Sequence, residues 1–97
     1  MLNQPLIEEF GKRIRQLRTE KNLSQEQLAE LSGFHRTYIG MVERGERNLS
    51  LANIGVFAGV FKLTVSELLD LGKINSEHNV SFYEIKRNNE NTEKNEY

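Results

Sequence analysis

Two short helical segments that meet at a single glycine constrain the fold of this chain most. Ser24 followed three residues later by Gln27 is the pattern of a capping box, which marks the first turn of an α-helix. Gly33 ends this first segment, because glycine readily takes the left-handed backbone conformation found at helix C-termini. A second helix is predicted from about His35 to Arg44, where apolar residues return at helical spacing. The sequence therefore predicts two short helices joined by a tight turn.

The residue types around this turn fit a pair of helices that cross steeply. The turn needs a residue tolerant of left-handed geometry, which Gly33 provides, and the crossing point needs a small residue, which Ala29 provides. Ile39 supplies a β-branched side chain that faces inward from the second helix. Spacing alone leaves two interpretations open: an ordinary αα-hairpin, or a helix-turn-helix that places its second helix in the major groove of DNA.

Helical spacing continues on both sides of this pair and predicts an all-α domain of five helices. The other three are expected at residues 6–20, at residues 50–61 and in a short segment that begins at Thr64 or Ser66, with Leu31 and Leu51 among the apolar positions of the second and fourth helices. Gly55 and Gly59 interrupt the fourth helix and lie on one face of it. Because glycine costs helix stability, we expect another helix to approach closely there.

The pattern changes after Gly72. We expect residues 1–72 to form the helical domain and residues 73–97 to form a C-terminal extension and polar tail. Within the extension, Val80–Ile85 is short, β-branched and aromatic, which predicts a strand. From Lys86 onward the chain is rich in Asn, Glu and Lys, with no apolar period.

Composition and spacing argue against an enzyme and against a cofactor or metal site. The chain has no cysteine, so disulfides and thiolate metal sites are excluded. His35 and His78 are the only histidines, and neither has a partner at metal-ligand spacing. No glycine-rich phosphate loop follows a strand. The N-terminus lacks the features of a signal peptide and no apolar run is long enough to span a membrane, so we expect a cytoplasmic protein.

Charge is unevenly distributed along the chain. The net charge is −1, yet residues 11–62 carry nine Lys and Arg against five Glu, whereas the two flanks are acidic. A basic centre can attract phosphate even in a chain that is acidic as a whole.

The order of residues in the central segment resembles the lambda-repressor-like helix-turn-helix family, also called the XRE family. The resemblance is carried by Leu-Ser-Gln-Glu-Gln-Leu-Ala-Glu-Leu-Ser-Gly at 23–33, Arg-Thr-Tyr-Ile at 36–39 and Val-Glu-Arg-Gly at 42–45, and it extends over about Phe10 to Leu71. The segments Arg-Thr-Tyr-Ile and Glu-Arg-Gly-Glu-Arg-Asn are also similar to the controller proteins of restriction–modification systems.

This resemblance implies which residues contact double-stranded DNA. The base-reading positions would be His35, Arg36, Thr37 and Gly40, and the phosphate-binding positions would be Gln25, Tyr38, Arg44, Arg47 and Asn48. Gly40 would leave the exposed face of its helix bare, so that the helix can approach DNA closely. Arginine suits guanine, because its fork matches O6 and N7. His35 is as well explained as a phosphate contact or a helix-start residue, and Tyr38 as a phosphate contact or a packing residue. Glu43 is expected to be structural, paired with Arg15 or Arg18, because an acid directed at DNA is unfavourable.

The predicted function is a sequence-specific transcription regulator that binds a pseudo-palindromic operator as a homodimer. One module contacts few bases, and a dimer reads two half-sites about one DNA turn apart. The dimer interface is predicted in the fifth helix and exposed parts of the fourth, through Phe61, Val65, Leu68 and Leu71; alternatively, Val80–Ile85 pairs across the two-fold axis. The other functional class is an antitoxin that binds a toxin and its own operator. RNA polymerase is a further candidate partner.

Overall fold

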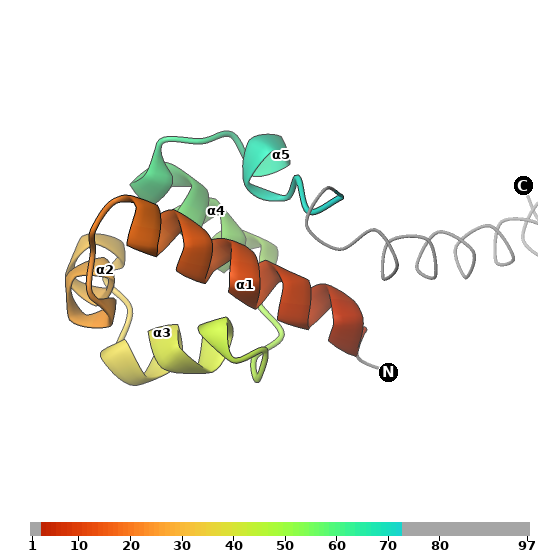
Figure 1. Ribbon diagram of the computed structural model, residues 1–97, viewed down its shortest axis with the longest axis horizontal. Helices are drawn as coiled ribbons and strands as arrows, with labels where there is room; N and C mark the ends of the chain where they lie inside the picture. The colour runs from red at the N-terminus through yellow and green to blue at the C-terminus, as the bar shows by residue number, and fades with distance from the viewer. Residues whose placement is uncertain (1–2, 73–97) are drawn as a thin grey trace, which may run out of the picture.

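The computed structural model describes residues 3–72, which form five helices (Figure 1). These are α1 (Gln4–Glu20), α2 (Gln25–Ser32), α3 (Arg36–Glu43), α4 (Leu51–Phe61) and α5 (Val65–Leu68). This part of the chain contains no strand, which confirms the predicted all-α fold. The predicted strand at Val80–Ile85 and the rest of the extension lie outside the described residues. None of the helices within residues 3–72 could span a lipid bilayer.

Four of the five helices described begin after a residue whose side chain caps them. The side chains of Asn3, Ser24, Ser50 and Thr64 each accept a hydrogen bond from a backbone N–H in the first turn of the helix that follows. Ser24 and Thr64 form complete capping boxes, so the fifth helix is capped by Thr64 and not by Ser66. A cap such as that of Ser24 contributes about 1 kcal/mol to helix stability.

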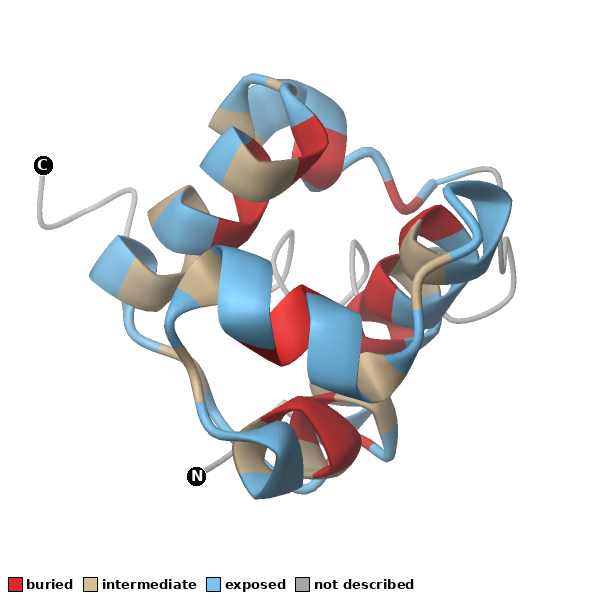
Figure 2. Ribbon diagram, turned by 90° about the vertical axis from the view of Figure 1, so that its left-hand side faces the viewer, coloured by how far each residue is buried: buried red, intermediate tan, exposed pale blue. Residues whose placement is uncertain are grey.

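The core contains buried residues from every helix described, and Phe57 is one of its fully buried side chains. The ring of Phe57 lies 6.2 Å from that of Phe10 and 5.1 Å from that of Phe34, so residues of α1, the α2–α3 turn and α4 meet there. Figure 2 shows buried positions turned toward this shared interior and exposed positions on the outside. Leu31 and Leu51, expected among the apolar face residues, are instead exposed to solvent. Helical spacing groups side chains on a face without showing how wide a face the neighbouring helices cover.

Gly11 sets how closely α1 approaches α3. A Cβ atom built at Gly11 would clash with the carbonyl oxygen of Val42 and would lie 2.8 Å from that of Glu43. Glycine therefore lets the backbones of these two helices pack in direct contact. No pattern in the sequence singles out this glycine.

The close helix approach predicted at Gly55 and Gly59 is not found. A Cβ atom built at either glycine meets no described atom of the chain within 4 Å. Both glycines face away from the core side of α4, which Phe57 and Ala58 occupy.

Three of the four residues predicted for the dimer interface lie in the chain's own interior. Phe61, Leu68 and Leu71 are buried, and only Val65 is partly exposed. The reason is that α5 folds back onto its own domain. The Arg13 side chain on α1 donates hydrogen bonds to the backbone oxygens of Glu67 at 2.9 Å and Leu68 at 3.1 Å, so α5 covers the core itself.

Candidate nucleic-acid interface

The turn between α2 and α3 has the predicted construction. Gly33 adopts a left-handed conformation with φ of 78°. The Ser32 hydroxyl donates a hydrogen bond to the oxygen of Ala29 and accepts one from the backbone N–H of Phe34, both at 3.2 Å. Ile39 is fully buried and Ala29 nearly so, which fixes the inner face of α3 against the domain. The opposite face of α3 is thereby directed outward.

The first residues of α3 form the exposed end of this helix. His35 takes the N-cap position in an extended conformation with no side-chain capping bond, and Arg36 and Thr37 are exposed after it. The Arg36 guanidinium lies 3.6 Å from the Glu26 carboxylate, and both side chains are mostly in solvent. A surface pair of this kind contributes little to stability, so Arg36 can exchange Glu26 for another acceptor. No pattern in the sequence predicts that Glu26 lies next to Arg36.

Gly40 does not lie on the exposed face where the sequence analysis placed it. It is buried, and a Cβ atom there would lie 3.0 Å from a guanidinium nitrogen of Arg44 and 3.8 Å from the Gln25 side-chain oxygen. The Arg44 side chain reaches back over the preceding turn of α3 and covers this position. Gly40 thus provides space for Arg44 instead of presenting a bare surface.

A buried ion pair joins α1 to the end of α3. Arg18 donates to both carboxylate oxygens of Glu43, at 2.6 and 3.0 Å, and these side chains are only 12% and 4% exposed. Arg18 also donates to the oxygen of Leu23 at 2.8 Å, and the Gln25 amide donates to Glu43 at 3.1 Å. This confirms the structural role of Glu43 and identifies Arg18, not Arg15, as its partner. The network holds the first residue of α2 beside α3.

Tyr38 packs within the domain and supports Arg47. Its ring lies 4.9 Å from that of Phe34, and its hydroxyl accepts a hydrogen bond from the Asn53 amide at 3.0 Å. The Arg47 guanidinium lies 5.5 Å from the centre of the Tyr38 ring, a cation–π geometry. Of the two roles considered for Tyr38, packing is the one seen here. Its contact with Asn53 joins residues of two helices, which spacing within one helix does not reveal.

Arg44 and Glu46 form an exposed pair beside Arg47 and Asn48. Arg44 donates to the two Glu46 oxygens at 3.0 and 3.2 Å. The hydrogen bond and charge of Glu46 raise the pKa of Arg44, and the hydrogen bond from Arg44 lowers the pKa of Glu46. Both groups are therefore charged at neutral pH, and a phosphate bound by Arg44 would compete with the Glu46 carboxylate. Within residues 3–72, no group of three His, Cys, Asp or Glu is arranged to hold a metal ion.

Comparison with known proteins connects this geometry to a family. Residues 14–68 match the helix-turn-helix family. Control protein C.SmaI of Serratia marcescens is 50% identical over 60 residues, which cover 62% of this chain and 71% of the relative. The crystal structure of the restriction-modification controller protein C.AhdI from Aeromonas hydrophila is 54% identical with a TM-score of 0.60, over 65% of this chain and 94% of that chain.

A third similar protein has a solved structure that contains DNA. The restriction-modification controller protein C.Esp1396I, a tetramer in complex with its natural 35 base-pair operator, is 31% identical with a TM-score of 0.60, over 66% of this chain and 88% of that one. These relatives are regulatory proteins rather than enzymes. The family match covers more than half of the chain and includes both helices that meet at Gly33, so this protein belongs to the helix-turn-helix family and is similar within it to restriction–modification controller proteins.

Proposed function

We propose that this protein is a sequence-specific DNA-binding transcription regulator that controls a restriction–modification system from the cytoplasm. The observation that carries the proposal is that Arg36 and Thr37 are exposed on a helix whose inner face is buried in the core. The names of the similar control proteins support the controller role over that of an antitoxin.

In the proposed complex, α3 enters the major groove with its first turn toward the bases. Arg36 would separate from Glu26, and its guanidinium would donate two hydrogen bonds to O6 and N7 of a guanine. Thr37 would offer a hydroxyl and a methyl group to a neighbouring base. Arg44, Arg47 and Asn48 would contact the DNA backbone at the other end of α3. The network of Arg18, Glu43 and Gln25 would hold the start of α2 close enough for Gln25 to reach a phosphate. Phosphate contacts of this kind fix the position and orientation of the protein on the DNA duplex.

Replacing Arg36 with alanine is expected to weaken operator binding by about 1–3 kcal/mol and to relax preference at one base pair. The reason is the loss of a bidentate base contact with no loss of packing, since the side chain is exposed. Titration of operator and random DNA by the variant measures this. Arg15→Ala, which removes an exposed arginine from α1, is the control. Equal losses on operator and random DNA would contradict base reading.

Replacing Arg47 with alanine is expected to weaken binding to all sequences alike. Loss of one phosphate contact should reduce the slope of log affinity against log salt by about one unit. Affinities measured over a salt series test this, with wild-type protein in the same buffers as the reference. An unchanged slope would remove Arg47 from the phosphate-binding residues.

The proposed homodimer requires an apolar surface other than the buried residues first predicted. The exposed face of α4 supplies one, with Ala52, Gly55, Val56 and Gly59 at helical spacing and open to solvent or nearly so. Replacing Val56 with lysine is expected to shift the protein from dimer to monomer in sedimentation at micromolar concentration, because it buries a charge between two apolar faces. Leu31→Lys, at an exposed leucine of α2, is the matched control. A wild-type protein that sediments as a monomer with and without DNA would reject the dimer.

A further inference from the structure

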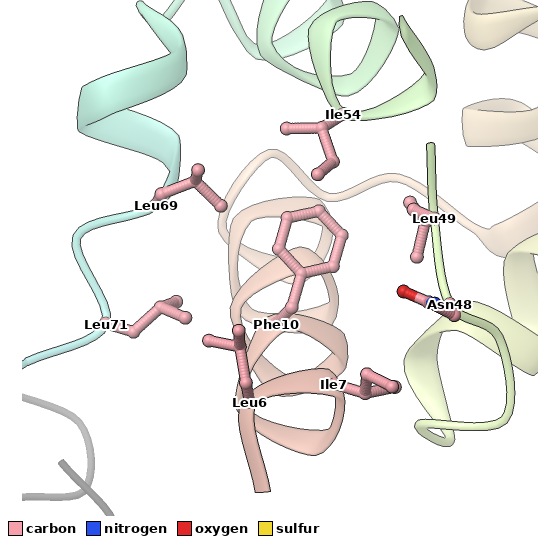
Figure 3. A pocket seen from close by; sticks show the side chains of 8 residues that line it. All are labelled: Leu6, Ile7, Phe10, Asn48, Leu49, Ile54, Leu69 and Leu71. Carbon is pink, nitrogen blue, oxygen red and sulfur yellow. The ribbon is translucent and has the colours of Figure 1, made fainter. Parts of the chain in front are cut away.

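An apolar pocket of about 190 Å³ opens between the start of α1 and the chain that follows α5 (Figure 3). Leu69 and Leu71 line one side, Leu49 and Ile54 another, and the Phe10 ring lies between them. Apolar cavities of about 150 Å³ are large enough to bind benzene, so this pocket can hold an aromatic ring. Leu6 and Leu69 at its edge are 42% and 38% exposed. Covering them would remove apolar surface from water.

The part of the chain that follows the pocket in the sequence contains a candidate occupant. Leu71 lines it, and residues 73–97 follow directly after Gly72. In those 25 residues the apolar side chains gather in Val80–Ile85, and outside this run only Ile74 and Tyr97 are apolar or aromatic. Phe82 is ten residues from Gly72, a length that spans about 33–36 Å when extended. The chain between Gly72 and Phe82 is therefore long enough to fold back to the pocket, which Leu71 itself lines.

We propose that Val80–Ile85 of the same chain docks in this pocket, with the Phe82 ring against Leu6, Leu69 and Leu71. In an extended segment Val80 and Phe82 point to the same side, so both can face the apolar lining. The short tether favours this intrachain contact over a second molecule, because it holds the segment at a high effective concentration.

The proposed docking is a property of this chain that goes beyond the fold it shares with similar structures. The similar C.AhdI structure is covered over 94% of its length by 65% of this chain, so about a third of this chain has no counterpart there. The proposal does not rest on the proposed function, because the pocket and the segment are independent of DNA.

Nuclear Overhauser contacts in the full-length protein test the proposal. With leucine methyl groups and phenylalanine rings as the observed protons, we expect contacts from Phe82 to Leu6, Leu69 and Leu71. Phe82→Ser should abolish them and lower Tm by about 4–8 °C, the shift expected when a small domain loses one modest apolar contact. Tyr97→Ser, which removes an aromatic ring from the polar end, is the matched control and should change neither measurement.

Two results would overturn the proposal. One is the absence of contacts between Phe82 and the pocket together with equal Tm values for Phe82→Ser and Tyr97→Ser. The other is a mixture of labelled and unlabelled protein in which the contacts arise only between different molecules, since the occupant would then be a second copy. Contacts found within one molecule would support the intrachain docking.

Discussion

Replacing Gly11 with alanine is expected to lower the free energy of unfolding by about 3 kcal/mol, because the added methyl group forces two helix backbones apart. The atoms it would meet are the carbonyl oxygens of Val42 and Glu43, and backbone atoms within α3 have little freedom to move. The clash exceeds the gain in helix propensity, which is about 1 kcal/mol for glycine to alanine. Urea denaturation followed by circular dichroism measures the difference.

Gly40→Ala is the matched control for this prediction. Gly40 is also buried within a helix, but the atom nearest its added methyl group is the tip of the Arg44 side chain, which is mostly exposed and can turn away. We therefore expect stability within about 1 kcal/mol of the wild type. A loss at Gly40 as large as that at Gly11 would contradict the assignment of Gly11 to a backbone contact.

Replacing Arg18 with methionine is expected to reduce the free energy of unfolding by about 3–5 kcal/mol, because it leaves the buried Glu43 carboxylate without its charged partner. The Gln25 amide is a neutral donor and does not replace the lost charge. Urea denaturation of the variant at neutral pH measures the loss. Arg15→Met, an exposed position on the same helix, is expected to stay within about 0.5 kcal/mol of wild type.

A double variant separates loss of the pair from loss of packing. Arg18→Met with Glu43→Leu removes both charges and should recover most of the stability, since apolar side chains can replace a buried ion pair. It should also release Gln25 from its carboxylate acceptor and weaken DNA binding by a folded protein. A double variant no more stable than Arg18→Met would show that the uncompensated Glu43 charge is not the cause.

Local sequence signals predicted the helices because their causes lie within a few residues. Capping by Ser24, Ser50 and Thr64 and the left-handed turn at Gly33 involve hydrogen bonds and backbone preferences within one turn of helix. Helical spacing placed Ile39 in the core. These features agree with the structure because no distant contact opposes them.

The structure corrected the predictions that depended on which neighbouring residues lie over a given helix face. Phe61, Leu68 and Leu71 were predicted to form an interface, yet all three are buried in their own domain. Arg13 holds α5 against α1 through the backbone oxygens of Glu67 and Leu68. Gly40 was expected to be bare and is covered by Arg44, whereas Gly55 and Gly59 were expected to be covered and face open space. Sequence spacing shows which residues share a face and not which neighbour meets that face.

Sequence patterns were enough to predict five helices, the turn at Gly33 and the outward position of Arg36 and Thr37 at the start of α3. Three features became visible only in the folded domain: the pairing of Arg18 with Glu43, the distance that Gly11 sets between α1 and α3, and the packing of α5 over its own core. The difference arises from separation along the chain. Capping and periodicity join residues at most four apart, whereas these contacts join residues from 25 to 55 apart, which meet only after the helices pack.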